Sequence, residues 1–400
     1  MRKILFFHHY NSPVGAGLSF LHILQSIDRT ENEIVVCLPK IEGELDSKIK
    51  AMGIRVIYSD SVVPYMHFSG SNMHYFSIRN FQNCRRISRA ESLLAKVIEE
   101  ENPCCVAVNS LTLLWVGKVA KSLGKKTICF HRETYAKGMF GIRTMRMKKE
   151  LSSYFDGIAF LSFYDLNETP MGQGKYVRIT DKVDVDAYKC LAKTECRDKL
   201  FLPQEEKLVL YLGGVSQLKG PLTAIRAMKW VKGAKLVFLQ YKYLPCSSFK
   251  ARLKYAVKIL LNRNLEYKIG RLIKREKLQG RVIFRPSTTC VEEYFTACDV
   301  VVFPSMHAHQ ARPIYEAGIA KKPVAITDFP NTQEFLDETN GWLFKKGDAR
   351  MLAKKLEEMF SRNAFDKVEK NYVRASSVNN LQTLAGELQS LLETVFSGDK

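Results

Sequence analysis

The side chains of this sequence that could do chemistry gather in a few glycine-rich or polar segments. One is the loop 213–220, which reads Gly-Gly-Val-Ser-Gln-Leu-Lys-Gly between an apolar run and a helix-like segment. Gly213 and Gly214 let backbone N–H groups face a diphosphate, and Lys219 supplies positive charge. No Gly-Lys-Ser/Thr triplet follows, so the loop is not a Walker A motif. We expect a phosphate-binding loop, with a solvated loop lysine as the alternative for Lys219.

A second polar segment spans residues 303–318, where an apolar run ends and a helix begins near Pro313. Unpaired N–H groups and the positive end of the helix suit an anion, and Glu316 in the first turn is able to accept hydrogen bonds from a ribose. The alternative for Glu316 is an acid that only stabilises the start of the helix. His307 and His309 lack a neighbouring acid cluster, so we expect surface histidines and no metal site.

A third segment is the loop 13–17, between the first apolar run and the first helix-like segment. It holds Gly15, Ala16 and Gly17 but is not a GxGxxG motif, because Phe20 stands at the third glycine position. A ligand-binding loop and a tight turn both remain open for it.

The elements that must position these segments form two similar series. Short β-branched runs alternate with helical patterns, which indicates parallel, doubly wound sheets of the α/β class. The strands expected first are 3–7, 33–38, 54–58, 104–108 and 127–130, with helices at 18–27, 44–52, 93–101 and 113–123. The pattern then restarts with strands 208–212, 235–240, 282–284, 300–303 and 323–327, and with helices at 223–230, 292–298 and 315–320. Two such halves imply two Rossmann-like domains facing a central cleft, with ligands at the carboxyl ends of the strands.

Composition limits the class of protein and of partner. With 400 residues, 46% hydrophobic and 26% charged, the chain is long enough for two packed cores, and disorder, collagen-like repeats and coiled coil are excluded. Lys and Arg number 61 against 41 acids, a net charge of +20, which favours an anionic partner. The ten cysteines include no CxxC pair, which is typical of reduced thiols in a cytoplasm.

Half of that charge lies in one segment. Residues 242–281 hold twelve Lys and Arg against two acids, and Phe249, Leu253 and Leu260 share one helical face there. A basic amphipathic helix is able to lie on an anionic membrane surface. The alternative is an ordinary helix packed on the sheet. No apolar run approaches the roughly 18 residues that span a bilayer.

Several motifs together resemble the donor-binding half of GT-B glycosyltransferases, most closely the retaining family 4, also called group 1. These motifs are Lys219-Gly220, Pro304-Ser305, Glu316-Ala317-Gly318, Lys322-Pro323-Val324, Asn331-Thr332-Gln333-Glu334, Asn340-Gly341 and Gly347-Asp348. The resemblance implies an acceptor-binding domain at 1–185, a donor-binding domain at 186–380 and a C-terminal helix at 381–400 that packs back toward the first domain.

The implied reaction is transfer of a sugar from a nucleotide-diphosphate sugar, with UDP-sugars favoured, to a saccharide or lipid-linked acceptor in cell-surface polysaccharide or glycolipid synthesis. The anomeric configuration would be retained, without metal or other cofactor. The catalytic residues implied are His131, Lys219 and Glu316, with a structural histidine as the alternative for His131, and the loop Gly15-Ala16-Gly17 would lie on the acceptor side. The residues implied to bind the donor are Gly213, Gly214, Lys219, His309, Ala311, Arg312, Pro313, Ile314, Glu316, Asn331 and Thr332.

Two positions depart from the family pattern. Gly214 stands where the family has a phosphate-binding arginine, and Ala308 replaces the first of two glutamates. A non-catalytic nucleotide-sugar-binding subunit and a sugar-nucleotide epimerase therefore remain alternatives. We expect no nucleic-acid partner, because no basic segment shows an RNA-binding pattern. The expected location is the cytoplasm, peripheral on the inner face of the cytoplasmic membrane.

Overall fold

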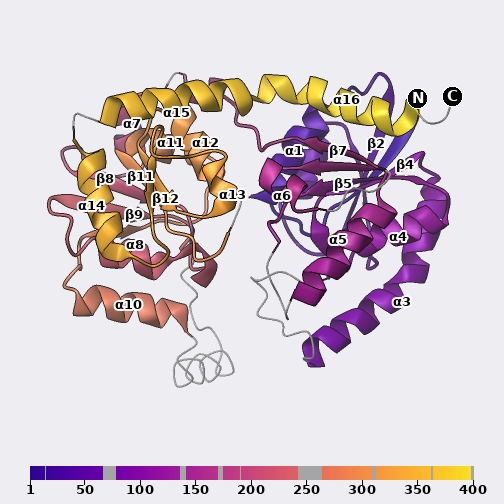
Figure 1. The fold of residues 1–400 in the computed structure, drawn as a ribbon, viewed down its shortest axis with the longest axis horizontal. Helices are drawn as coiled ribbons and strands as arrows, with labels where there is room; N and C mark the ends of the chain where they lie inside the picture. Colours follow the sequence, from indigo (N-terminus) through magenta and orange to yellow (C-terminus); the bar gives the residue numbers. More distant parts are fainter. Residues whose placement is uncertain are drawn as a thin grey trace. The chain divides into compact units, whose positions relative to one another are not determined.

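The computed structural model describes residues 1–13, 15–65, 78–135, 141–169, 174–189, 191–241, 264–308, 312–361 and 364–397, with only the backbone of Arg79. The chain divides into two units (Figure 1). Unit 1 comprises Met1–Lys182 together with Leu381–Lys400, and unit 2 comprises Val183–Asn380.

Unit 1 is built on a seven-stranded sheet in the order β3-β2-β1-β4-β5-β6-β7, in which all pairings are parallel. The strands are β1 (Arg2–Phe7), β2 (Asn32–Leu38), β3 (Arg55–Tyr58), β4 (Cys105–Val108), β5 (Lys126–His131), β6 (Gly157–Phe160) and β7 (Lys175–Arg178). Since the order reverses beside β1, the loops after β1 and β4 diverge at the carboxyl edge of the sheet, where such folds bind ligands.

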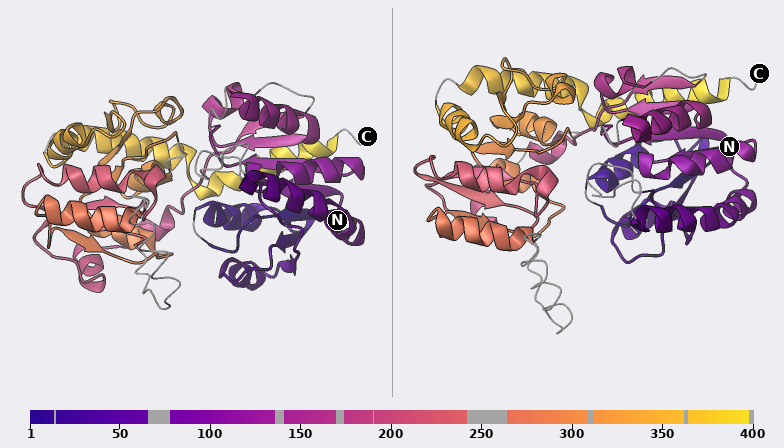
Figure 2. Two further views of the ribbon diagram at one scale, coloured as in Figure 1. Left: turned by 90° about the horizontal axis from the view of Figure 1, so that it is seen from below. Right: turned by 60° about the horizontal axis from the view of Figure 1, so that its bottom comes forward.

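Both faces of this sheet are covered, so its strands are apolar on both sides (Figure 2). Alternate residues of β1 divide between two cores, with Leu5 and Phe7 in one and Ile4 and Phe6 in the other. The first core receives α3 (Ile78–Glu101), α4 (Leu114–Ser122) and α5 (Ile142–Tyr154). The second receives α1 (Ala16–Ser26), α2 (Leu45–Ala51) and α16 (Leu384–Phe396). The short α6 (Phe163–Asn167) follows β6.

Unit 2 has a six-stranded parallel sheet in the order β10-β9-β8-β11-β12-β13. Its strands are β8 (Lys207–Tyr211), β9 (Ala234–Phe238), β10 (Val282–Phe284), β11 (Val300–Phe303), β12 (Val324–Thr327) and β13 (Trp342–Phe344). One face packs on α7 (Lys193–Lys199), α11 (Val291–Ala297), α12 (Arg312–Ile319) and α15 (Phe365–Val378). The other packs on α8 (Pro221–Ala227), α10 (Leu265–Arg275) and α14 (Ala349–Met359). Here the order reverses between β8 and β11.

These two sheets confirm the predicted pair of parallel, doubly wound α/β halves. The prediction of a helix at 93–101 was too short, because α3 begins at Ile78. Its first half is polar and basic and lacks the apolar periodicity that indicates a helix. Of the adjacent cysteines at the start of β4, Cys105 is buried and Cys104 is exposed.

Candidate functional site

The point in unit 2 where the strand order reverses is formed by the loops that follow β8 and β11. The two loops are joined: the Met306 N–H donates to the Leu218 carbonyl at 2.6 Å. A side chain at Gly220 would place Cβ 1.8 Å from the Pro304 carbonyl oxygen. Only glycine permits this approach, and Gly220 also has a left-handed φ of 65°. The loop that contains Lys219 is therefore fixed against the Pro304-Ser305 segment.

The glycine pair in this loop has no room for larger side chains. The hydroxyl of Tyr211 lies beneath it and donates to the carbonyls of Gly214 at 3.1 Å and Lys219 at 3.2 Å. A Cβ at Gly213 would come within 2.1 Å of that hydroxyl oxygen. Gly214 has φ of +59°, and a Cβ there would lie 3.1 Å from Gln240. This backbone gives a physical reason why Gly214 replaces the arginine of the family pattern, since an arginine would be strained at that φ.

Lys219 is the cation of this loop. It ends the short 3-10 helix Gln217–Lys219 and makes no ion pair with any residue that the structure describes. Burial lowers the pKa of Lys219 below its ordinary value of 10.5. A half-buried ammonium without a partner is costly, and an anionic ligand would offset that cost.

Arg312 and Glu316 form a pair on the first turns of α12. The Arg312 Nε donates to Glu316 Oε1 at 2.8 Å, and both side chains are buried to 14% exposure or less. Their spacing of four residues places both on one face of the helix. Pro313 is half-buried and Ile314 is in the core, whereas His309 and Ala311 lie outside the described residues.

Asn331 and Thr332 lie on α13 (Pro330–Gln333), directly after β12, and both are buried. The Thr332 hydroxyl donates to the Phe329 carbonyl at 2.7 Å and accepts from the Phe329 N–H at 3.3 Å. This hydroxyl therefore closes the turn that presents Asn331, at the same carboxyl edge as Lys219 and Glu316.

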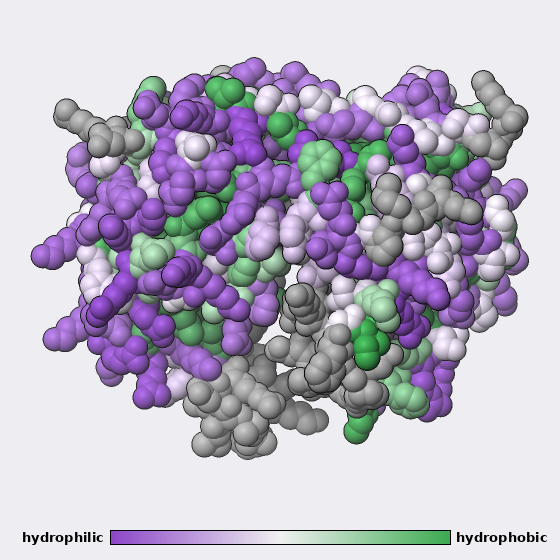
Figure 3. Space-filling model, viewed as in Figure 1, coloured by the Kyte–Doolittle hydropathy of each residue, from purple (hydrophilic) through white to green (hydrophobic). Residues whose placement is uncertain are grey.

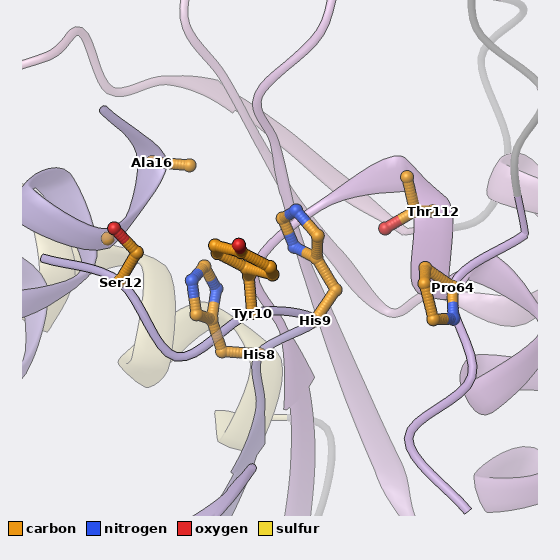
Figure 4. Close-up of a pocket in the computed structure, with 8 residues that line it drawn as sticks. His8, His9, Tyr10, Ser12, Ala16, Pro64 and Thr112 are labelled. Atoms are coloured by element: carbon orange, nitrogen blue, oxygen red, sulfur yellow. The ribbon is translucent and has the colours of Figure 1, made fainter. Parts of the chain in front are cut away.

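Unit 1 has a pocket of about 310 Å³ where its own strand order reverses. Figure 4 shows the rings of His8, Tyr10 and His9 along the loop after β1. The other lining residues are Ser12, Ala16, Gly17, Pro64 and Thr112. Ala16 and Gly17 of the predicted loop thus contribute to the pocket, while Gly15 is not among its lining residues. Gly17 is required there, because a Cβ would lie 1.8 Å from the Ser12 carbonyl oxygen.

The histidines of this pocket are neutral. Burial, together with the neighbouring His9, lowers the pKa of His8 well below 6.5, and burial lowers the pKa of His9 to about 4. The His8 Nδ1 lies 3.1 Å from Asn109 Nδ2, and Asn109 Oδ1 accepts from Arg132 Nε at 3.0 Å. Arg132 is itself paired with Asp181 at 2.8 Å. The pocket is therefore lined by uncharged groups.

Beside this network, Glu133 is held by two hydrogen bonds. It accepts from the Ser110 hydroxyl at 2.6 Å and from the Leu111 N–H at 3.0 Å. Burial raises the pKa of Glu133, although the two hydrogen bonds oppose the rise. Sequence reasoning missed His8, His9 and Asn109, and the available signal was a pair of histidines directly after the first apolar run.

His131 is the last residue of β5 and is 1% exposed. Its ring lies 4.8 Å from that of Phe160 and 4.9 Å from that of Tyr135. Neither ring nitrogen has a hydrogen-bond partner among the described residues, and burial lowers the pKa of His131 to about 3. His131 is thus a neutral imidazole in an aromatic environment.

In the described part of the chain, no group of three His, Cys, Asp or Glu side chains is arranged to hold a metal ion. Nor does any helix in these ranges have the length and apolarity to cross a membrane.

Comparison with known proteins finds a family model that matches part of the chain. Residues 192–376 match the family model described as glycosyl transferases group 1. No curated protein matches the chain in sequence.

Solved structures resemble the whole chain. The Anabaena protein HepE, solved in complex with UDP and glucose, has a TM-score of 0.77 at 16% identity and covers 98% of this chain and 100% of its own. Sucrose-phosphate synthase from Thermosynechococcus elongatus has a TM-score of 0.75 at 16% identity, with 100% of both chains covered. TarM from S. aureus, in a complex that includes UDP, has a TM-score of 0.70 at 12% identity, covering 99% of this chain and 100% of its own. Residues 192–376 of unit 2 are therefore similar in sequence to the glycosyl transferases group 1, and the whole chain has the GT-B fold of these solved structures.

Proposed function

We propose that this chain transfers a sugar from a UDP-sugar to a hydroxyl of a saccharide or lipid-linked acceptor, in cell-surface polysaccharide or glycolipid synthesis, with retention of configuration. The observation that carries the proposal is the donor-side edge of unit 2, where Lys219, which has no ion pair among the described residues, and the Arg312–Glu316 pair follow strands of one sheet. The similar Anabaena protein HepE has been solved with UDP-glucose, which supports a UDP-sugar as the donor.

Each donor-side residue then has a stated role. Lys219 and the backbone N–H groups of the Gly213-Gly214 loop neutralise the diphosphate as it leaves with the bonding electron pair of the anomeric carbon. Glu316 accepts hydrogen bonds from the ribose hydroxyls, and Arg312 holds the Glu316 carboxylate in place at 2.8 Å. Asn331 and the backbone of Arg312–Ile314 contact the sugar, and the same role is proposed for His309 and Ala311, which lie outside the described residues. Stabilising the leaving group by fixed charges and dipoles requires no metal.

The acceptor binds in the pocket of unit 1. Because its lining is uncharged, it suits a neutral sugar ring, which would stack on Tyr10 and hydrogen-bond to Thr112 and His9. A volume of about 310 Å³ is near the lower end of ligand pockets, as expected for one or two sugar units. His131, whose ring nitrogens lack described partners, acts toward the reacting sugar as a neutral hydrogen-bonding group.

The basic segment 242–281 is proposed to bring the protein to the inner face of the cytoplasmic membrane. Residues 242–263, including Phe249, Leu253 and Leu260, lie outside the described residues. In the described remainder, α10 buries Ile269 and Leu272 in the core of unit 2. The contribution of α10 is thus its solvated cations.

The experiment that tests the proposal is a screen of sugar nucleotides for thermal stabilisation of the chain, followed by a transfer assay with neutral glycosides and lipid-linked acceptors. We expect a UDP-sugar to stabilise, and transfer to continue in EDTA. Failure of every sugar nucleotide to stabilise the chain would refute the donor site. Loss of transfer in EDTA with recovery on adding manganese would refute metal independence.

A non-catalytic nucleotide-sugar-binding subunit is the second candidate, favoured by Ala308 at the position of a family glutamate. It predicts the same stabilisation by a UDP-sugar but neither transfer nor hydrolysis. Ala308→Glu should then be the substitution that brings activity.

A further inference from the structure

Charge is distributed unevenly along α3. Residues 78–89 contain four arginines and no acid, whereas residues 90–101 contain four glutamates and one lysine. Arg85, Arg86 and Arg89 are exposed, and none forms an ion pair with a residue that the structure describes. Arg89 is four residues from Arg85 and three from Arg86, so like charges share one face and repel each other. Packing of α3 on the sheet does not require this arrangement.

The first half of α5 repeats the feature. Residues 142–149 contain Arg143, Arg146, Lys148 and Lys149 and no acid. Arg143 and Arg146, and Arg146 and Lys149, are spaced three apart. Two acids from outside this half pair with it: Glu150 with Arg146 at 2.8 Å and Glu168 with Lys148 at 3.0 Å. Of the α5 cations, Lys149 is exposed and forms no ion pair with a described residue, as is the case for Arg85, Arg86 and Arg89 of α3.

The same two half-helices expose large apolar side chains. Ile78 is 76% exposed, Phe81 62%, Ile142 52% and Met145 67%. The core-facing sides of these helices are made by other residues, such as Leu94 on α3 and Leu151 on α5. Figure 3 shows apolar side chains among hydrophilic ones over the lower ends of α3 and α5. Exposed apolar groups interleaved with cations mark an interaction surface rather than an ordinary solvated face.

This surface adjoins the pocket of unit 1. Both helices begin at the carboxyl edge of the sheet and flank α4, which contacts each of them (Figure 1). On one side, Asn83 Nδ2 of α3 donates to the carbonyl of Pro64, a lining residue, at 3.1 Å. On the other, the Lys148 Nζ of α5 lies 4.9 Å from the ring of Tyr135, which contacts His131.

We propose that the first halves of α3 (78–89) and α5 (142–149) form a docking surface for an anionic lipid bilayer, here named the α3/α5 surface. Its exposed cations Arg85, Arg86, Arg89 and Lys149 bind lipid headgroups, while Ile78, Phe81, Ile142 and Met145 enter the interface between headgroups and acyl chains. Three of these four apolar side chains, Ile78, Ile142 and Met145, are not aromatic and do not stack on bases as nucleic-acid sites require, so lipid fits this surface better than a nucleic acid. Lipid binding itself does not depend on the proposed transfer reaction. If that reaction holds, docking brings the pocket to the lipid-linked acceptor.

The test is flotation of the full chain with vesicles of phosphatidylcholine alone or mixed with phosphatidylglycerol. We expect binding only to the anionic vesicles, weakened by salt. Arg85→Glu/Arg86→Glu/Arg89→Glu should lower partition about a hundredfold or more, since each basic residue near an anionic surface contributes roughly fivefold. The double variant Phe81→Ser/Met145→Ser, at exposed positions, should lower it at least fivefold.

The matched control changes charge equally elsewhere on unit 1. The control variant is Lys48→Glu/Lys96→Glu/Lys125→Glu, whose three positions lie outside the α3/α5 surface. Its partition into anionic vesicles should stay within about threefold of that of the parent chain. All these variants should bind UDP as the parent does in calorimetry, so a failure of the donor site is distinguishable from a failure of docking.

Three results would overturn the proposal. One is equal binding to neutral and anionic vesicles, or binding to neither. Another is an equal loss of vesicle binding in the control variant and the arginine variant, which would show that binding depends only on the net charge of the chain. The third is displacement from vesicles by an oligonucleotide with no effect of Phe81→Ser/Met145→Ser, which would assign the surface to a polyanion.

Discussion

Lys219 is the residue on which the donor site depends most directly, because it is the cation of the loop and lacks a described partner. Lys219→Ala should weaken UDP binding by roughly 1.5–3 kcal/mol, the scale of a hydrogen bond to a charged group. Calorimetry measures this, with Lys232→Ala, an exposed lysine of the same unit, as the matched control. Unchanged affinity in Lys219→Ala would contradict the assignment.

The lowered pKa of Lys219 adds a pH dependence. Only the protonated amine attracts a diphosphate, and burial moves the loss of that proton to a pH below the ordinary 10.5. UDP affinity should therefore fall as pH rises toward that lowered pKa. Lys219→Arg keeps its charge at any pH of interest and should remove the fall. A parallel decline in both proteins would assign the pH effect to another group.

The neutral histidines of unit 1 should make the folded chain less stable as the pH falls. The pKa of His131 is about 3 and that of His9 about 4 in the folded chain, against about 6.5 when unfolded. The unfolded state therefore takes up protons first, and stability present above pH 6.5 is lost as pH falls. Between pH 7.5 and 5 each histidine should lower the free energy of unfolding of unit 1 by about 2 kcal/mol.

Urea unfolding at both pH values checks this, with His131→Phe as the variant. Its ring would join Phe160 and Tyr135 without a titrating group, so its loss of stability in acid should be about 2 kcal/mol smaller. An unaltered slope with pH would show that His131 titrates normally.

At the scale of elements, α16 illustrates how a glycine decides whether a helix packs. Gly157 of β6 faces α16, and a Cβ there would lie 2.6 Å from Val395 Cγ2 and 3.1 Å from Leu391 Cδ1. Gly157→Ala should therefore destabilise unit 1 by about 1–3 kcal/mol through overpacking. Gly386 lies within α16 itself and has nothing within 4 Å of its Cβ position. Gly386→Ala should stabilise by about 0.5–1 kcal/mol. Thermal unfolding of the two variants should thus move in opposite directions, and shifts of the same sign would contradict this packing.

The elements also show how far the sequence alone leads. Buried strands such as β1 and β11 are continuous apolar runs, so their place and the parallel class were predictable. The first half of α3 was not, because its residues serve a surface rather than a core. The pocket of unit 1 escaped prediction for another reason: it joins His8, Pro64 and Thr112, which only the sheet order brings together. The fit of Gly214 to its loop likewise depends on a positive φ that no sequence pattern reports.

At the scale of the whole molecule, the two units differ in how the chain builds them. Unit 2 is one continuous segment, Val183–Asn380. Unit 1 is made of two segments, and the second, which contains α16, follows unit 2 in the sequence. Lys182, buried at the end of the first segment, bonds Thr383 at 3.0 Å and Glu387 at 2.5 Å in the second. A fragment of residues 183–380 should therefore fold alone and bind UDP within about threefold of the full chain.

A fragment of residues 1–182 should not fold alone, because the sheet face that receives Leu384, Leu388 and Leu391 would be bare. Circular dichroism and calorimetry of the two fragments check both expectations, with Lys219→Ala in the 183–380 fragment as the control for UDP binding. A well-folded 1–182 fragment would show that α16 is dispensable.

The position of α16 also has a consequence for synthesis on the ribosome. The strands of unit 1 have all emerged once Lys182 has left the exit tunnel, but α16, one of the three helices on one face of its sheet, is made after the whole of unit 2. At 5–20 residues per second, that delay is on the order of 10–40 s. For this time the part of that apolar face that α16 covers, beside β6 and β7, is exposed on the nascent chain. Unit 2, although later in the sequence, is the first part able to complete its fold. Chaperones should therefore bind mainly to unit 1, most of which is translated first.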